Sequence, residues 1–168
     1  IKAVKNNFGN SFDLVINHFC LSGIDFACIY IHSLVDINII NSLSQEIFSF
    51  KQELGSSNKG KTKNIEEILF NLQGFRKSRI AFDYETLYDE ILLGNTVILI
   101  EGSKRFLSVS SFSSDGRPVE EATSQTVIRG PKESFNENIY TNVLLIRKRL
   151  RSDLLRFEKK QVGRYTKT

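Results

Sequence analysis

Strand-like apolar runs and short turns alternate at the start of the chain. Residues 13–21 and 26–32 are rich in β-branched and aromatic residues, and Ser22-Gly23 lies between them. Two such runs joined by a few residues that include glycine are typical of a β-hairpin. The pattern therefore predicts an antiparallel hairpin with a loop slightly longer than two residues.

After the hairpin, apolar residues recur at the spacing of a helix. Asp36 is a favoured N-cap residue, and apolar residues then recur every three or four positions, which predicts a helix with one apolar face. These apolar residues are Ile37, Ile40, Leu43, Ile47 and Phe50. The polar residues 55–63 predict a loop, and residues 65–72 predict a second, short helix.

Strands and a helix alternate again in the middle of the chain. Residues 80–82 predict a short strand, and Asp83 predicts the N-cap of a helix that Gly94 ends. Residues 97–100 and 105–112 predict two more strands, joined as a hairpin.

The clearest helix lies near the C-terminal end of the chain. Ser134 and Glu137 fit a capping box, which predicts that the helix begins there. Its predicted apolar face consists of Phe135, Ile139, Val143, Ile146 and Leu150. Its opposite face carries the cations Arg147, Lys148, Arg149 and Arg151. Residues 126–128 and 153–163 predict two further strands.

Together these elements predict a mixed α/β (α+β) fold. We expect two small mixed-sheet subdomains joined near residue 93, with residues 1–92 in the first and residues 93–168 in the second.

The composition is that of a globular protein, with 40% hydrophobic and 25% charged residues. No apolar run approaches the roughly 20 residues that a membrane helix needs. Because the chain starts at Ile1 and contains no methionine, we expect it to be a fragment of a longer protein.

The net charge is +4, and the excess of positive charge lies in residues 147–167. Such a segment would attract nucleic acid or an anionic membrane surface, and it also fits a solvated helix face near a membrane. Proteins that bind single strands stack successive bases on several aromatic residues, whereas this segment has two, Phe157 and Tyr165. We therefore expect no nucleic-acid partner.

The two cysteines and two histidines give weak signals. Cys20 and Cys28 are too few for a disulfide framework, which favours a reducing compartment, with a disulfide between neighbouring strands as the alternative. His18 and His32 would bind a metal only with a further ligand, for example Cys20. We expect ordinary strand histidines, no metal and no other cofactor.

Residues 55–62 read GSSNKGKT and match the phosphate-binding P-loop pattern. In that role Gly60 would approach a phosphate, Lys61 would contact it and Thr62 would bind magnesium. A P-loop follows a buried strand, whereas the residues before Gly55 have helical spacing. Nucleotide binding through Gly55–Thr62 is therefore the alternative hypothesis, not the leading one.

Glu120 and Glu121 are the most prominent pair of carboxylates. Adjacent residues of an extended segment point to opposite faces, so these two are poorly placed to share a proton. Pairing with Arg117 or Arg129 is expected instead. No spacing of serine, cysteine, histidine and acidic residues indicates a catalytic group, and we expect that the protein is not an enzyme.

Residues 118–150, PVEEATSQTVIRGPKESFNENIYTNVLLIRKRL, resemble the signature of the A subunits of GerA-family germinant receptors. The matching positions are Glu120-Glu121, residues 127–133, Phe135, Glu137-Asn138, Thr141-Asn142 and residues 146–149. Residues 9–13, 30–36, 93–103 and 162–168 also resemble the family, so the resemblance covers nearly the whole chain. Residues 110–116 and 122–125 depart from the family pattern.

The resemblance implies a protein of the spore inner membrane whose hydrophilic N-terminal domain precedes transmembrane helices. It implies that nutrients trigger the receptor, that B and C subunits are partners, and that this domain is soluble on the cytoplasmic (core) side. We also expect self-association of A subunits, contact with the membrane through a missing C-terminal part, and a small nutrient as a ligand, here or on another subunit.

The expected functional residues lie in the signature segment. We expect Arg129, Gly130 and Pro131 to shape a loop. For contacts with another subunit or subdomain we expect four residues, Asn138, Asn142, Arg147 and Arg149. A second version of the receptor hypothesis places the nutrient-binding site in a cleft between the two subdomains.

Overall fold

One antiparallel sheet forms the centre of the computed structural model, which describes residues 1–21, 23–56, 77–113 and 135–164. Within these residues the strand order is β1-β2-β4-β5-β3, and every neighbouring pair is antiparallel. The strands are β1 (Leu14–Leu21), β2 (Ile24–Ile31), β3 (Ser78–Ala81), β4 (Thr96–Ile100) and β5 (Phe106–Val109). The expected α/β mixture is confirmed.

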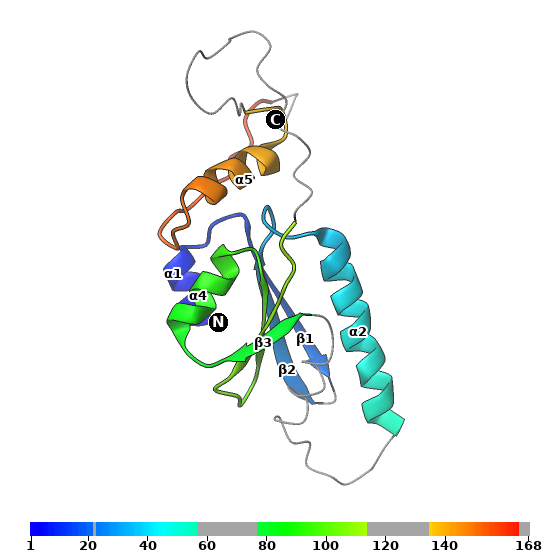
Figure 1. Ribbon diagram of the computed structural model, residues 1–168. Coiled ribbons are helices and arrows are strands. Elements are labelled where there is room, and N and C mark those ends of the chain that lie inside the picture. Colours follow the sequence, from blue (N-terminus) through cyan, green and yellow to red (C-terminus); the bar gives the residue numbers. More distant parts are fainter. Residues whose placement is uncertain (22, 57–76, 114–134, 165–168) are drawn as a thin grey trace.

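The described helices lie on both faces of the sheet and at one end of it (Figure 1). They are α1 (Lys2–Phe8), α2 (Ile37–Ser56), α4 (Tyr84–Leu92) and α5 (Ile139–Arg149). Helices α1 and α4 cover one face, α2 covers the other, and α5 lies across the upper end in Figure 1. Among the described helices none is both long enough and apolar enough to span a bilayer.

The two cores follow from the alternation of side chains along the strands. On β2, Ala27, Ile29 and Ile31 face α1 and α4, where they pack with residues such as Phe8 and Ile91. Phe26 on the same strand faces the other way, and it packs in the cluster that contains Leu43 and Ile47 of α2. Because both faces are covered, β2 is apolar at nearly every position.

The hairpin of β1 and β2 is confirmed, but its turn is tighter than expected. Leu21 pairs with Ile24, so only two residues connect the strands, and Gly23 has a φ of 82°. A left-handed backbone at the turn favours glycine. The apolar pattern marked the strands but not the position at which pairing stops.

Two aspartates cap helices as predicted. The Asp36 carboxylate accepts a hydrogen bond from the Asn38 N–H at 2.8 Å, at the start of α2. The Asp83 carboxylate accepts from the Thr86 N–H at 2.6 Å, at the start of α4. Hydrogen bonding with Thr86 lowers the pKa of Asp83 because it stabilises the charged form of the carboxylate.

The described strands do not divide into two sheets at residue 93. β2 pairs with β4 along residues 26–29, and β4 pairs with β5. β3 comes earlier in the chain but lies beyond β5 at the edge of the sheet. Strands from both sides of the expected boundary therefore belong to one sheet, which is antiparallel rather than mixed.

The C-terminal part differs most from the expectation. Helix α5 begins at Ile139 rather than near Ser134, and Phe135 lies before it with 67% of its surface exposed. Ile139 and Leu150 are also exposed, so the predicted apolar face is wrong at its ends, while Val143 is buried and Ile146 is half-buried. Residues 153–163 form no strand, although their sequence alternates. The strand expected at 126–128 and the helix expected at 65–72 lie outside the described residues.

Candidate functional site

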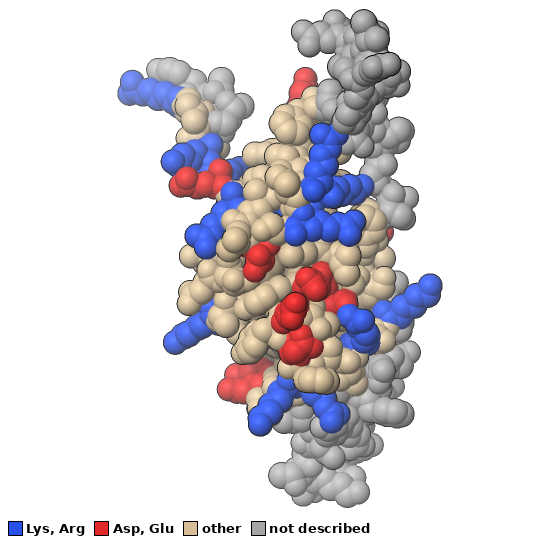
Figure 2. All heavy atoms as spheres, turned by 60° about the vertical axis from the view of Figure 1, so that its left-hand side comes forward, with Lys and Arg blue, Asp and Glu red and all other residues tan. Residues whose placement is uncertain are grey.

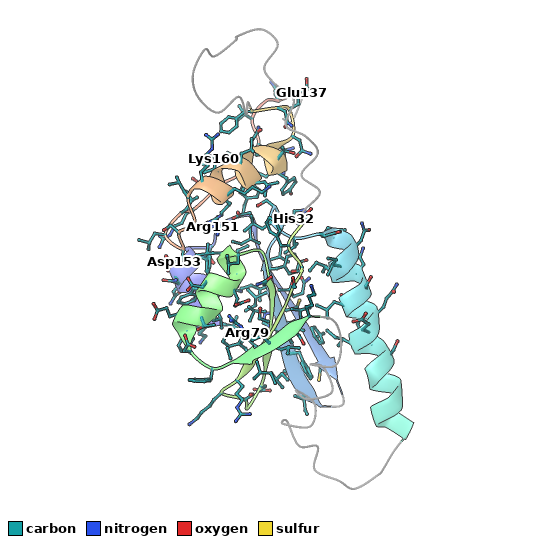
Figure 3. All side chains as sticks on the ribbon, viewed as in Figure 1. His32, Arg79, Glu137, Arg151, Asp153 and Lys160 are labelled. Atoms are coloured by element: carbon teal, nitrogen blue, oxygen red, sulfur yellow. The ribbon has the colours of Figure 1, made fainter. Side chains whose placement is uncertain are left out.

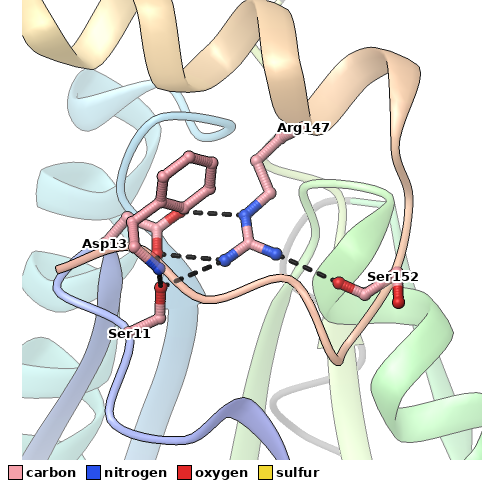
Figure 4. Close-up of polar contacts among 5 residues, drawn as sticks. Ser11, Asp13, Arg147 and Ser152 are labelled. Carbon is pink, nitrogen blue, oxygen red and sulfur yellow. Dashed lines mark hydrogen bonds and ion pairs between the residues drawn. The ribbon is translucent and has the colours of Figure 1, made fainter.

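A buried arginine is the centre of the most distinctive polar cluster in the described structure. Arg147, near the end of α5, is only 1% exposed. Its Nε lies 3.0 Å from Oδ2 of Asp13, and its Nη2 lies 3.1 Å from Oδ1 of the same carboxylate (Figure 4). Two parallel hydrogen bonds of this kind are the strongest arrangement that an arginine and a carboxylate make.

The remaining donors of Arg147 are also used. Nη1 donates to the backbone carbonyl of Ser152 at 3.1 Å, and Nη2 donates to Oγ of Ser11 at 3.3 Å. The guanidinium also lies over the ring of Phe157, with 5.0 Å between its carbon and the ring centroid. A buried charge is stable only when it is paired and hydrogen-bonded, and this one meets both conditions.

Ser11 links this cluster to the chain that follows α5. Its hydroxyl donates to Oδ1 of Asp13 at 2.6 Å and accepts from the backbone N–H of Phe157 at 2.8 Å. The Phe12 N–H donates to the Phe157 carbonyl at 3.0 Å. Just before β1, Asp13 thus holds α5, and Ser11 and Phe12 hold the segment after it. We call Ser11, Asp13, Arg147, Ser152 and Phe157 the arginine clamp.

The structure places Arg147 on a different side of α5 from the one expected. The helical pattern assigned this residue to the basic face of α5, but its side chain points into the molecule. The buried residues of α5 are Val143, Leu145 and Arg147, and Leu144 packs against the α1–α4 core. Val143 and Arg147 are four residues apart and so share a helix face, which is the one sequence signal that indicated burial.

Asn138 and Asn142 make local hydrogen bonds in the described structure. Asn138 is the N-cap of α5, and its side chain accepts from the N–H groups of Tyr140 and Thr141. The Asn142 side chain bonds both the N–H and the carbonyl of Asn136, at 2.8 and 2.7 Å. This pair therefore shapes the entry into α5, a role that the sequence analysis did not assign to it.

The other expected site residues divide into two groups. Arg149 is exposed on α5. The remainder lie outside the described residues: Glu120, Glu121, Arg129, Gly130, Pro131, Gly60, Lys61 and Thr62. Helix α2 continues through Gly55 to Ser56, so a helix precedes the phosphate-loop pattern where a P-loop requires a strand.

Aromatic rings extend the clamp toward β2. The His32 ring meets the Tyr140 ring edge-on at 4.8 Å, and Phe12 lies 6.0 Å from the same tyrosine. Figure 3 shows His32 between the sheet and α5. His32 is therefore part of the packing between α5 and the sheet.

A second buried carboxylate was missed by the sequence analysis. Glu90 on α4 is 5% exposed and accepts hydrogen bonds from Arg79 on β3, Asn95 and Ser108 on β5. Helix α4, strands β3 and β5, and the loop that contains Asn95 thereby meet at one carboxylate. Nothing in the residues around Glu90 indicates that this acidic side chain of the helix faces the sheet.

A cleft of about 930 Å³ opens at the end of β1 and β2 opposite the clamp. Its inner wall is apolar, with Val4, Leu87 and Phe106, and its lining also includes charged residues such as Asp25 and Lys104. His18 and Cys20 line the cleft as well, and neither Cys20 nor Cys28 forms a disulfide. No three His, Cys, Asp or Glu side chains of the described ranges are grouped to hold a metal ion.

The comparison with known families is decisive. The model of the family described as "Bacillus/Clostridium GerA spore germination protein" matches residues 2–168. The chain belongs to this family. The match includes both halves of the clamp, since Ser11 and Asp13 lie near one end of it and Arg147 lies near the other.

Named proteins of spore formers are similar to this GerA-family chain. Spore germination protein KA of Bacillus subtilis is 29% identical over 171 residues, which is all of this chain and 30% of that protein. Spore germination protein GerLA of Bacillus cereus is 24% identical, over 98% of this chain and 33% of that protein. The chain thus spans about a third of the length of these relatives.

A solved structure has the same fold. It is the crystal structure of the N-terminal domain of the A subunit of the Bacillus megaterium spore germinant receptor GerK3. The TM-score is 0.69 at 23% identity, and the match covers 99% of this chain and 59% of that one. At this identity the likeness shows the fold, and it agrees with the α/β arrangement described above.

Proposed function

We propose that this chain is the N-terminal domain of the A subunit of a spore germinant receptor, and that it acts in receptor assembly and in transmitting the nutrient signal. The observation that carries the proposal is the buried ion pair between Arg147 and Asp13. This pair joins α5, which lies in the signature segment, to residues 9–13, a separate segment that also resembles the family. Both partners have fully buried side chains.

The clamp suits transmission because it makes α5 and the sheet a single rigid unit. Removing one partner of a buried ion pair costs roughly 3–5 kcal/mol, so α5 resists separation from β1. A displacement at the chain beyond residue 157 would therefore reach the sheet rather than be absorbed by a loose helix. Rigid elements with few alternative arrangements are the means by which domains transmit motion.

A non-catalytic role is part of the proposal. A catalytic group must contact its substrate, whereas the Arg147 and Asp13 side chains are both 0% exposed. Their hydrogen bonds are made to the chain's own Ser11 and Ser152. The chemistry of the clamp is therefore that of a structural connection.

The surroundings of the domain follow from the same proposal. We place it in the spore inner membrane as part of a complex with B and C subunits, with self-association of A subunits as a further contact. The domain itself would lie on the core side, and the membrane would be reached through other parts of the full protein. The names of the relatives, which are spore germination proteins, support this placement.

The cleft opposite the clamp supports a second candidate role, binding of a small nutrient. Its volume of about 930 Å³ is within the range of small-molecule sites, and it combines an apolar wall with charged groups. Titration calorimetry of the chain against a panel of amino acids, sugars and nucleosides tests this role. Heat of binding that Phe106→Trp abolishes would support it, and no heat with any of these compounds would exclude the cleft as the nutrient site.

Germination of spores that carry the full receptor tests the main proposal. Arg147→Lys keeps the charge but cannot make the two parallel bonds to Asp13. Arg151→Lys, at an exposed arginine just after α5, is the matched control. We expect slower nutrient-triggered release of dipicolinate with Arg147→Lys at normal receptor level, and normal release with the control. Normal release from both strains would contradict the proposal.

A further inference from the structure

Exposed cations gather at the C-terminal end of the described chain. Seven lysine and arginine side chains are exposed between residues 148 and 164: Lys148, Arg149, Arg151, Arg156, Lys159, Lys160 and Arg164. Figure 2 shows blue side chains over the upper part of the molecule, where α5 lies, with the larger red group below them. In Figure 3 Arg151 and Lys160 both lie close to α5.

Acidic residues do little to neutralise this region. The same stretch holds two, Asp153 and Glu158. Asp153 turns toward α1, where its carboxylate accepts a hydrogen bond from Asn7. Glu158 pairs with Lys160 at 3.3 Å, and both side chains are mostly exposed. Within residues 148–164, seven exposed cations and two carboxylates leave an excess of positive charge.

Exposed aliphatic side chains lie among the cations. Leu150 is 57% exposed, Leu154 is 70% exposed and Val162 is 71% exposed. Cations that alternate with exposed aliphatic side chains fit one kind of partner particularly well, because a bilayer surface offers both anionic headgroups and an apolar layer just beneath them. We call these three residues and the seven cations the basic surface.

We propose that the basic surface binds an anionic phospholipid bilayer, with the cations at the headgroups and Leu150, Leu154 and Val162 inserted between them. Each lysine or arginine near such a surface strengthens the attraction, and each inserted aliphatic side chain adds apolar burial. The proposal concerns contact of this domain with lipid and does not rest on its role in signalling.

The arginine clamp gives the first part of the basic surface, up to residue 157, a fixed shape. Residues 150–164 contain no helix or strand, but the Phe157 backbone bonds Ser11 and Phe12, at 2.8 and 3.0 Å. Arg147 bonds the Ser152 carbonyl at 3.1 Å. Residues 150–157 are therefore held against the sheet, so less conformational entropy is lost when the surface binds than would be lost by a loose tail.

Nucleic acid is a weaker match to the same surface. Proteins that bind single strands stack bases on exposed aromatic rings. Between residues 148 and 164 the aromatic residue is Phe157, and its ring lies beneath the Arg147 guanidinium. The exposed apolar side chains here are aliphatic instead, which suits lipid.

Co-sedimentation of the 168-residue chain with vesicles tests the proposal. The vesicles are phosphatidylcholine alone and an equal mixture of phosphatidylcholine and phosphatidylglycerol. We expect binding to the mixed vesicles at low salt, weaker binding at high salt, and little binding to phosphatidylcholine alone. No binding to the mixed vesicles at low salt, or equal binding to both kinds, would overturn the proposal.

Variants show whether the basic surface makes the contact. Lys159→Gln with Lys160→Gln removes two cations, and about 1 kcal/mol for each predicts roughly thirtyfold weaker binding. The matched control, Lys77→Gln with Lys104→Gln, removes two exposed cations at β3 and at the β4–β5 turn. Leu154→Ser should weaken binding severalfold with an unchanged salt dependence.

Two outcomes would reject the basic surface as a lipid site. One is equal weakening of vesicle binding by the control pair and by the Lys159–Lys160 pair. The total positive charge of the chain, rather than the basic surface, would then explain the binding. The other is tighter binding of the chain to duplex DNA than to the mixed vesicles at the same salt, which would make nucleic acid the partner.

Discussion

The guanidinium of Arg147 and the carboxylate of Asp13 form a buried, two-bonded ion pair between residues that are far apart in the chain. Nε–Oδ2 is 3.0 Å and Nη2–Oδ1 is 3.1 Å, and neither side chain is exposed. The pair connects the end of α5 to the start of β1. It therefore fixes the position of α5 on the sheet.

Loss of Arg147 should destabilise the fold strongly. Arg147→Met leaves the Asp13 carboxylate buried without a partner, and we expect a loss of about 3–5 kcal/mol in the free energy of unfolding. Urea denaturation followed by circular dichroism measures this value. Arg151→Met is the control because this side chain is exposed, and the expected change is within about 0.5 kcal/mol. An effect of Arg147→Met as small as that of the control would mean that the pair is not buried in solution.

Replacing both partners should recover much of that loss. Arg147→Met combined with Asp13→Leu removes both charges and leaves apolar groups in their place. We expect the double variant to be more stable than Arg147→Met alone by at least about 1 kcal/mol, because no buried charge remains. Additive losses in the same urea measurement would contradict a direct interaction between the two residues.

Asn138 should contribute to stability as a helix cap. Asn138→Ala removes the side chain that accepts hydrogen bonds from Tyr140 and Thr141, and such a loss costs about 1 kcal/mol. Asn138→Asp keeps the acceptor and serves as the control, with stability near that of the parent chain. Equal losses from the two variants in thermal denaturation would indicate a role other than capping.

Gly9 should tolerate a side chain poorly. Its φ is 58°, and an added Cβ would meet the side chain of Arg156, which packs over this turn. A left-handed conformation costs a residue other than glycine roughly 1–2 kcal/mol. We therefore expect Gly9→Ala to lower the free energy of unfolding by about that amount. Combining it with Arg156→Ala separates the contact from the backbone strain, because only the strain then remains.

The buried thiol of Cys28 should make stability depend on pH above neutrality. Burial raises the pKa of Cys28 from 9.0 to about 12. Between these values the unfolded chain loses the thiol proton and the folded chain keeps it. The contribution of Cys28 is therefore fully present below about pH 9 and is lost as the pH rises toward 12.

The comparison with Cys28→Ala isolates this effect, since other groups titrate in both proteins. The free energy of unfolding of the parent chain should fall more steeply between pH 9 and 11, by roughly 1 kcal/mol per pH unit. Thiol labelling gives an independent measure, because Cys20 is exposed and should react while Cys28 stays protected. Equal slopes for the two proteins would show that Cys28 ionises freely in the folded state.

Local signals in the sequence predicted the elements well where one physical cause decides the outcome. Asp36 and Asp83 cap helices because a carboxylate accepts from free N–H groups, and both positions were identified correctly. The β4 and β5 hairpin was also correct, since two apolar runs with a short polar connection have few alternatives.

Strand order and buried charges could not be predicted in this way. Nothing in the residues of β3 indicates that it lies beyond β5, because apolar alternation is the same at any position in a sheet. Arg147 was placed on a solvated face since arginine is seldom buried. Its partner Asp13 lies far away in the sequence, and only the folded chain brings the two together.

The measurement that tests the coupling role most directly is a double-variant comparison in spores. The full receptor would carry Asp13→Asn, Arg147→Lys or both, and nutrient-triggered dipicolinate release would be timed at equal receptor level. If the pair transmits the signal as one unit, both single changes slow release and the double change slows it no further. A double change that slows release by the product of the two single effects would contradict this coupling. Normal release from all three strains would contradict it as well.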